Sequence, residues 1–548
     1  MDHIHLFNQI KDRKNIERAY QYACSDRLNY DYYFDYFEMN YVLKNRESII
    51  NDVFTSLNNP DKYIPITSYD FYPPKTDLCF RRMIYVSFKD LIIRYAFVGI
   101  FADYLDRELS DNCYANRRSS GTRANKFLLE DFSTQSWPKF CSWQRECAKK
   151  ARILLRTDIS AFYDSISHDY LIKQIADGLS ISEETEVIKF FRKILSIPVI
   201  SYSNIYKAVQ TSRNTKQGLA IGNTPDAFLA NLYLLDVDKQ MNEIDSIKFG
   251  RYNDDMRIFG NDRGEVFNAI LSLQQLLLSK GLNLNSGKSK IAEDQVQIED
   301  LRSKSYEFEY YQDIEYEKDE EKITDEKIKN EKEIDIPFDE FNEKLDPSFI
   351  IEKNEDAKKY CKFFNSNNLL PLKLRSPEYV QKLEDIFKKW HGSDKFASWL
   401  LIQTIFWKEI PEKSKKMAIE ILFRSLSSEE VSSYCKYRLI HHLLKKHGVK
   451  EKYRYLDKMD KGYINELNKL IPMFLSQPAF ELNISALYLL YVQGVTEERI
   501  REKVEKYALK PIGDPIKTAL SYIKEPLEIH QNIPIDNNFE VDSIPEYY

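Results

Sequence analysis

The spacing of apolar residues changes character near residue 300. Before that point, some segments follow the two-residue period of a β-strand and others follow the 3.6-residue period of an α-helix. The run ARILLRTDI (151–159) is typical of a buried strand, and SIKFGRYNDDMRIFG (246–260) predicts a strand, a tight turn and a second strand. Apolar residues recur at helical spacing over 264–281, and Thr224-Pro225-Asp226 predicts a helix start with a hydroxyl cap and proline at the first helical position. We therefore expect an α+β region.

From about 350 to 525 the apolar residues follow the helical period throughout. Examples are the segments KFASWLLIQTIFWKEI, KSKKMAIEILFRSL, YCKYRLIHHLLKKH and SALYLLYVQG. Breaks are predicted at Pro411, Gly448, Pro478, Gly494 and Pro511. Successive short helices of this kind indicate a helical-repeat array, although an ordinary helical bundle fits the pattern equally well.

Charge separates these two regions. Residues 312–346 are highly charged and weakly periodic, which predicts a flexible or marginally helical linker or insertion. Its core, Asp313 to Asp335, holds 11 acidic residues and 5 lysines, so it accounts for the whole formal net charge of −6. Residues 112–156 instead carry ten Lys and Arg against three acidic residues. This basic segment is a candidate phosphate-binding surface, with a solvated basic face as the alternative.

Length and composition limit the class of protein. A chain of 548 residues exceeds what one hydrophobic core supports, so at least two domains are expected. No stretch approaches the ~18–20 apolar residues of a membrane span, and no signal peptide is evident, which predicts an intracellular protein. The seven cysteines include no Cys-x-x-Cys pair, so neither a disulfide framework nor a zinc site is predicted.

Three carboxylates are candidates for catalysis because each is predicted to lie where a strand ends. Asp158 follows the first strand run, and Asp254 and Asp255 occupy the predicted hairpin turn. Clustered carboxylates repel one another and need a counter-charge, which Mg²⁺ provides while leaving coordination sites open for phosphate. Taken alone, however, an Asp-Asp turn is more often an ordinary surface hairpin.

Four ordered segments strengthen the catalytic interpretation: 157–166 (TDISAFYDSI), 217–225 (QGLAIGNTP), 252–255 (YNDD) and 284–289 (LNSGKS). This series resembles motifs A, B, C and D of the right-hand polymerase palm in reverse transcriptases. Upstream, Pro74-Lys75, the segment 82–86 and the segment 113–117 resemble the fingers of the retron and group II intron branch. The resemblance spans residues 74–291. It implies an α+β right-hand polymerase fingers and palm domain, followed here by an all-α helical-repeat-like C-terminal domain.

The resemblance implies roles for individual residues. The metal-binding and catalytic carboxylates would be Asp158, Asp254 and Asp255, holding two Mg²⁺ ions, with Mn²⁺ as an alternative. The expected proton donor to pyrophosphate is Lys288, although Lys290 lies close by. The nucleotide-binding residues would be Lys75, Arg82, Tyr163, Gln217 and Gly218, and Arg81 is an alternative to Arg82. Within this set Tyr163 matches the steric gate that excludes a ribose 2′-OH, with an ordinary core aromatic as the alternative.

Two features depart from many relatives. Motif B has Gly222-Asn223-Thr224-Pro225 where many relatives have a small residue and serine before the proline, and Asn253 occupies the variable position of motif C. No thumb is recognisable after motif D. A palm followed by helices resembles the bacterial defence-associated reverse transcriptases of the abortive-infection and "unknown group" clade, with retrons and group II maturases as alternatives. That assignment implies antiphage defence, a bacterial cytoplasmic location, a homo-oligomer, dNTP substrates and a nucleic-acid partner, either nascent single-stranded DNA or a non-coding RNA template.

The expected domains are a tyrosine-rich helical segment at 1–60, fingers and palm at 61–311, the linker at 312–346, the helical domain at 347–530 and a tail at 531–548. Seven tyrosines lie between Tyr20 and Tyr41, for which core packing or an oligomer interface is the default interpretation. The resemblance adds a second interpretation, synthesis of DNA primed on a protein hydroxyl without a template. A catalytically degenerate nucleic-acid-binding scaffold is the alternative from a different functional class.

Overall fold

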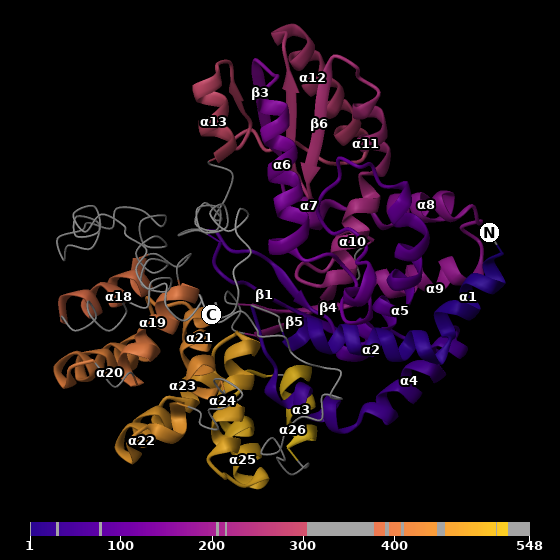
Figure 1. Cartoon of the computed structure of the whole chain (residues 1–548). Coiled ribbons are helices and arrows are strands. Elements are labelled where there is room, and N and C mark those ends of the chain that lie inside the picture. The colour runs from indigo at the N-terminus through magenta and orange to yellow at the C-terminus, as the bar shows by residue number, and fades with distance from the viewer. Residues whose placement is uncertain are drawn as a thin grey trace, which may run out of the picture.

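The computed structural model describes residues 2–28, 32–75, 79–203, 208–213, 216–303, 377–389, 394–406, 410–445, 455–510 and 512–523 (Figure 1). The predicted linker at 312–346 and the predicted tail at 531–548 lie outside these residues, as do the predicted breaks at Gly448 and Pro511.

A four-stranded antiparallel sheet carries the predicted carboxylates. Its strands are ordered β6 (Ile247–Tyr252), β7 (Asp255–Gly260), β3 (Ile153–Asp158) and β8 (Lys290–Ala292). The strand predicted at 151–159 and the hairpin predicted at 246–260 are confirmed. In Figure 1 this sheet lies at the top of the view, beside α6 and α12.

A second four-stranded sheet is ordered β2 (Met83–Tyr85), β1 (Ser68–Phe71), β4 (Val199–Ser203) and β5 (Ala208–Arg213). Strand β1 pairs with β2 in antiparallel and with β4 in parallel orientation. These strands include the predicted fingers segment, and we refer to β1, β2 and the connection between them as the fingers hairpin.

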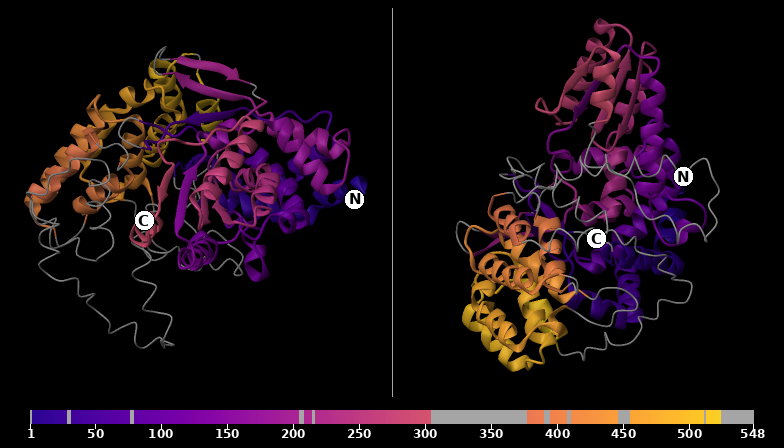
Figure 2. Two further views of the ribbon diagram at one scale, coloured as in Figure 1. Left: turned by 90° about the horizontal axis from the view of Figure 1, so that it is seen from above. Right: turned by 60° about the vertical axis from the view of Figure 1, so that its left-hand side comes forward.

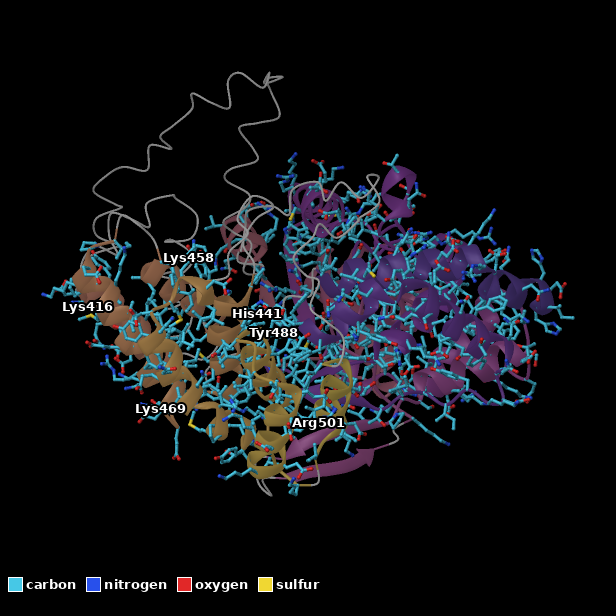
Figure 3. The ribbon with its side chains drawn as sticks, turned by 90° about the horizontal axis from the view of Figure 1, so that it is seen from below. Lys416, His441, Lys458, Lys469, Tyr488 and Arg501 are labelled. Atoms are coloured by element: carbon cyan, nitrogen blue, oxygen red, sulfur yellow. The ribbon has the colours of Figure 1, made fainter. Side chains whose placement is uncertain are left out.

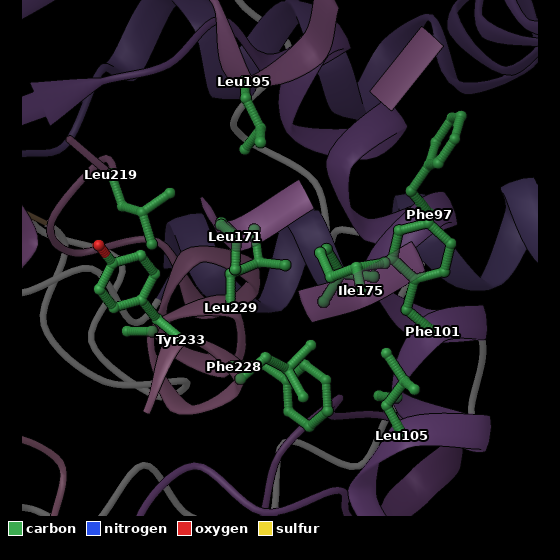
Figure 4. Packing of buried hydrophobic residues seen from close by; sticks show 14 of the residues in the cluster. Phe97, Phe101, Leu105, Leu171, Ile175, Leu195, Leu219, Phe228, Leu229 and Tyr233 are labelled. Atoms are coloured by element: carbon green, nitrogen blue, oxygen red, sulfur yellow. The ribbon is translucent and has the colours of Figure 1, made fainter. Parts of the chain in front are cut away.

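Helix α5 (Phe88–Leu105) is the centre of the first half of the chain, because nearly all of its residues are buried. Figure 4 shows Phe97 and Phe101 of this helix in the core with Leu171, Ile175 and Phe228. The other helices and helical turns of residues 2–303 are α1 (His3–Lys11), α2 (Arg13–Leu28), α3 (Tyr36–Lys44), α4 (Arg46–Asn58), η1 (Asp106–Glu108), η2 (Gly121–Asn125), η3 (Phe132–Ser136), α6 (Trp137–Ala148), α7 (Phe162–Ser165), α8 (His168–Leu179), α9 (Glu186–Leu195), α10 (Thr224–Tyr233), α11 (Leu235–Asn242), α12 (Arg263–Ser279) and α13 (Gln295–Ser303).

The helix predicted at 264–281 is confirmed as α12, and the helix start near residue 224 is confirmed as α10. The predicted hydroxyl cap is wrong. Asn223 holds the N-cap position without a side-chain cap hydrogen bond, and Thr224 is already the first helical residue. The Thr224 hydroxyl instead donates to Asp26 Oδ1 at 2.9 Å, so a tertiary contact with α2 replaces the local cap.

The described part of the C-terminal half, residues 377–523, contains helices and no strands. The helices and helical turns are α18 (Pro377–Lys389), α19 (Asp394–Phe406), α20 (Glu412–Ser427), α21 (Ser433–Leu444), η5 (Tyr455–Lys458), α22 (Lys461–Lys469), α23 (Ile471–Leu475), α24 (Phe480–Val492), α25 (Glu497–Tyr507) and α26 (Asp514–Tyr522). The four helical segments predicted from the apolar period correspond to α19, α20, α21 and α24. Their arrangement as repeats stays a prediction.

The C-terminal helices share one hydrophobic core with the N-terminal tyrosines and the fingers hairpin. Tyr33 contacts the rings of Tyr85, Tyr437 and Phe480, with centroid separations of 4.9, 5.6 and 5.1 Å. Tyr36 stacks on Tyr488 at 4.5 Å. Figure 2 shows the C-terminal helices, in orange to yellow, against the first half of the chain, and Figure 3 labels Tyr488 and His441 in this region.

Core packing, the default interpretation of the tyrosine-rich segment, is therefore confirmed for the described tyrosines that are buried, namely Tyr20, Tyr22, Tyr33 and Tyr36. The predicted domains at 61–311 and 347–530 are not independent in their packing, because α21 and α24 complete the core against which β1 and β2 pack.

Glu481, on α24, is buried in this shared core and lies near Asp70 of β1. Burial raises the pKa of Glu481 to about 7, and the Asp70 carboxylate adds to the rise. A glutamate in an unfolded chain titrates near ~4.3, so the folded protein binds this proton more tightly. The contribution of Glu481 to the free energy of unfolding should therefore fall as pH rises from ~4 to ~7 and level off above that range.

We predict that Glu481→Gln stabilises the protein at pH 8 by about 1–3 kcal/mol and has little effect at pH 4, because glutamine cannot ionise. The measurement is denaturant unfolding of both proteins across this pH range. Glu498→Gln, at an exposed position of α25, is the matched control for loss of one carboxylate. An equal effect of Glu481→Gln at both pH values would contradict the prediction.

Candidate active site

Backbone pairing brings the two predicted carboxylate segments together. Strand β3 ends at Asp158, whose Cα is paired with that of Asp255 at the start of β7. Asn253 and Asp254 form the turn between β6 and β7. Asn253 has φ 58°, a left-handed conformation that asparagine tolerates better than most residues. The tight turn therefore holds Asp254 at the end of the sheet where β3 also ends.

Asp158 and Asp254 interact directly. Burial raises the pKa of Asp254 to about 7, and the charge of Asp158 is the next largest cause. The Lys288 ammonium forms an ion pair with Asp158 Oδ2. Asp158 Oδ1 is buried and has no hydrogen-bond partner among the described residues.

Lys288 reaches this position through backbone contacts between motif D and the end of β3. Asn285 N donates to the carbonyl of Asp158 at 2.7 Å, and Ser160 N donates to the carbonyl of Asn283 at 2.8 Å. The Thr157 and Ser289 hydroxyls are 2.7 Å apart. The segment that carries the lysine is thus fixed to the strand that carries the carboxylate.

Asp255 lies beside this pair, but its carboxylate contacts arginines. Its Oδ2 accepts a hydrogen bond from Arg257 Nη2 at 2.9 Å, and its Oδ1 also accepts one from Arg257 Nη1. Arg156 Nε lies 3.8 Å from the same Oδ1. The structure therefore brings Asp158, Asp254 and Lys288 together and pairs Asp255 with two arginines.

The donor set at the strand ends fits a hard divalent cation. Two carboxylates meet there, and a buried oxygen of Asp158 lacks a partner within the described residues. Such ions take carboxylate oxygens and complete their coordination with water and substrate phosphates. No group of three or more His, Cys, Asp or Glu side chains arranged to hold a metal ion is found in the described part of the chain. Asp158 and Asp254 are thus the residues suited to Mg²⁺ or Mn²⁺.

A buried ionic network beneath the hairpin was missed by the sequence analysis. Arg251 is fully buried and donates to both carboxylate oxygens of Asp238, at 2.7 Å each. It also donates to Asn231 Oδ1 at 2.8 Å and to the carbonyl of Asn253 at 3.1 Å. Arg251 therefore ties the carboxylate turn to α10 and α11. An arginine within a strand that is otherwise largely buried was the available signal for such a network.

The motif B loop supports the segment that carries Tyr163. Gly218 N donates to the carbonyl of Ile166 at 2.8 Å, and Leu219 N donates to the carbonyl of Tyr163 at 2.9 Å. Gly218 has φ +93°, a conformation that other residues rarely adopt. Gln217 is exposed at the start of this loop and forms a β-bridge with Ser167.

Tyr163, on α7, lies next to the carboxylates. Burial raises its pKa, the Asp254 charge adds to the rise, and the Arg81 guanidinium opposes it. The ring is partly buried against the main core. Tyr163 is thus close enough to Asp254 for the two side chains to interact, and its role as a steric gate stays a prediction.

The predicted fingers cations differ in their surroundings. Lys75 is exposed on the fingers hairpin. Arg82 Nε donates to Asp70 Oδ2 at 3.1 Å, and its Nη1 lies 3.7 Å from Asp164 Oδ1 on α7. Arg81 Nη1 instead donates to the Tyr32 hydroxyl at 3.0 Å. Both arginines therefore connect the fingers hairpin to other parts of the chain.

The basic segment 112–156 is largely neutralised by ion pairs. Six of its ten cations lie within ion-pair distance of an acidic residue: Arg117, Arg118, Arg123, Lys139, Lys149 and Arg156. Arg117 and Arg118 pair with Asp106 and Asp103, which lie outside the segment. The interpretation as a phosphate-binding surface is correspondingly weakened.

Residues 100–310 match the family model described as reverse transcriptase (RNA-dependent DNA polymerase). The matched segment contains Asp158, Asp254, Asp255 and Lys288, whereas Lys75 and Arg82 precede it. The match indicates an enzyme with RNA-directed DNA polymerase activity. No curated protein matches the chain. Among the described residues, no helix is both long and apolar enough to cross a membrane.

Proposed function

We propose that this chain is a reverse transcriptase-type DNA polymerase that transfers dNTPs by a two-metal mechanism and acts in antiphage defence by abortive infection. The observation that carries the catalytic part is the meeting of Asp158, Asp254 and Lys288 at the strand ends, inside the segment that matches the reverse transcriptase family. The defence role is supported by the architecture, a palm followed by a helical C-terminal region.

Asp158 and Asp254 would hold Mg²⁺, with Mn²⁺ as an alternative. When bound, the ions supply counter-charge to the triphosphate and activate the attacking hydroxyl. Lys288, placed against Asp158, would donate a proton to the departing pyrophosphate. Asp255, the third proposed ligand, would have to leave Arg257 to bind metal, because in its observed position at the start of β7 it forms an ion pair with that arginine.

The remaining proposed residues would bind the nucleotide. Lys75 and Arg82 would contact the triphosphate from the fingers hairpin. Gln217 and Gly218 would form the floor under the new base pair, and Tyr163 would contact the sugar. The proposed partners are dNTPs, a nascent single strand or a template RNA, and further copies of this chain, in a bacterial cytoplasm.

We predict that Asp254→Asn lowers dNTP incorporation by roughly 100-fold or more, because a neutral amide removes charge that balances the metal. The measurement is incorporation of labelled dNTPs with Mg²⁺ by purified protein. Asp245→Asn, at an exposed position before β6, is the matched control and should retain wild-type activity. Full activity of Asp254→Asn would refute the site. An inactive wild-type protein would favour the scaffold alternative.

We predict that Tyr163→Val increases incorporation of rNTPs relative to dNTPs, because the smaller side chain leaves room for a 2′-OH. Competition between one rNTP and the matching dNTP measures this ratio. Tyr163→Phe keeps the ring and should keep the wild-type preference. If Tyr163→Val leaves sugar discrimination unchanged, the residue serves the core instead.

Priming is the least constrained part of the proposal, and we favour synthesis primed on a protein hydroxyl without a template. Tyr20, Tyr22, Tyr33 and Tyr36 are poor candidates for the primer because they are buried in the core. The alternative is RNA-templated synthesis of cDNA on a partner non-coding RNA.

We predict that labelled product stays with the protein through denaturation, is released as DNA only after proteolysis, and is lost when one exposed Tyr or Ser is substituted. The protein is incubated with dNTPs singly and together, with and without RNase pretreatment. Loss of synthesis after RNase, with a product of one defined sequence, would establish the RNA-templated alternative. Free DNA from a denatured, unproteolysed sample would refute protein priming.

A further inference from the structure

The two adjacent arginines of the fingers hairpin differ in how their charge is balanced. Arg82 lies between the carboxylates of Asp70 and Asp164. Arg81 forms no ion pair within the described part of the chain, and its guanidinium donates to the neutral hydroxyl of Tyr32 at 3.0 Å. Fewer carboxylates therefore offset the positive charge of Arg81 than that of Arg82, so Arg81 is better suited to bind an anion.

Arg81 lies near the candidate active site, because the next residue, Arg82, is 3.7 Å from Asp164 on α7, the helix that also carries Tyr163. Its charge acts on the Tyr163 hydroxyl, which in turn lies beside Asp254. A triphosphate placed over Asp158 and Asp254 would approach this guanidinium. A long arginine side chain has many rotamers, so a fixed hydrogen bond to Tyr32 reduces the entropy lost when the triphosphate binds.

Tyr32 is itself held by the C-terminal helices. The Tyr434 hydroxyl, on α21, donates to the backbone carbonyl of Tyr32 at 3.0 Å. Two residues later, Phe34 N donates to the Tyr437 hydroxyl, also at 3.0 Å. Between them, Tyr33 is buried in the shared aromatic core. The backbone of 32–34 is therefore fixed against α21, while the Tyr32 side chain reaches the fingers hairpin.

We propose that Tyr32 is a positioning residue of the nucleotide site, which orients Arg81 toward the triphosphate and links that arginine to the C-terminal helices through Tyr434. This inference rests on the proposed polymerase function and deepens it. The C-terminal helices then contribute to nucleotide affinity although none of their side chains needs to contact the nucleotide.

The expected result for Tyr32→Phe is a KM for dNTP that rises roughly 3- to 10-fold while kcat stays within about twofold, because one hydrogen bond to a charged group is lost and the metal-binding pair is untouched. Tyr434→Phe should change KM in the same direction by a smaller factor. Both KM and kcat are measured on the full-length protein by steady-state incorporation of one labelled dNTP.

Tyr41→Phe is the matched control, because Tyr41 stacks on Tyr522 at 4.5 Å in the same interface without contact to the fingers arginines in the described structure. It should leave KM unchanged. Thermal unfolding of each variant separates positioning from stability. Tyr32→Phe and Tyr41→Phe should both unfold at nearly the wild-type temperature, whereas only Tyr32→Phe should show a raised KM.

A double-mutant cycle decides whether Tyr32 acts through Arg81. Arg81→Ala should raise KM, and Tyr32→Phe should have no further effect in that background. Equal KM for Tyr32→Phe and wild type, or additive effects of Tyr32→Phe and Arg81→Ala, would overturn the inference and leave the polymerase function standing. A wild-type protein that incorporates no dNTP would overturn both.

Discussion

The close approach of Asp158 and Asp254 is the constraint on which the arrangement of the candidate active site depends. Two like charges about 4 Å apart repel by about 4 kcal/mol at an effective dielectric of ~20, so the remainder of the fold must hold them together. The β3 and β7 pairing sets their spacing, the Lys288 ammonium offsets part of the repulsion, and the buried Arg251 holds the turn from beneath. Burial and mutual repulsion raise the pKa of Asp254 as a consequence.

The need to hold the carboxylate turn in place also explains why charged groups are buried next to it. Arg251 and Asp238 make two hydrogen bonds in a fully buried pair, a geometry that offsets the cost of removing both charges from water. A hydrophobic pair of similar volume would pack as well but would offer no donor for the carbonyl of Asn253. The ionic network is therefore better explained by the orientation of the carboxylate turn than by stability alone.

Local sequence patterns predicted the strands and the turn of the site, but contacts between residues far apart in the sequence determine which side chains pair there. A buried apolar run predicted β3, and two strand-like segments around the Asn-Asp turn predicted β6 and β7, because these signals lie within a few residues. The pairing of Asp255 with Arg257 was not predicted, since the strand pattern does not say which neighbour a side chain selects. The positive charge of 112–156 was counted correctly, but the sequence did not show that Asp103 and Asp106, outside the segment, form ion pairs with Arg118 and Arg117. Likewise, the Thr224 hydroxyl donates to Asp26 and does not cap its own helix.

Chain length predicted at least two domains, and the structure shows that residues of the two largest predicted domains share one hydrophobic core. The sequence does not show which residues a tyrosine-rich segment will contact. Only the structure shows that Tyr33 packs between the fingers hairpin and the helices α21 and α24, and that Tyr36 stacks on Tyr488 of α24. Close-packed cores transmit displacements because they contain few voids that absorb them. A shift of α21 would therefore reach β1 and β2 through aromatic contacts, and through them the fingers cations. Arg82 is anchored by carboxylates of β1 and α7, so it would resist such a shift more than Arg81, whose contact leads back to α21 through Tyr32.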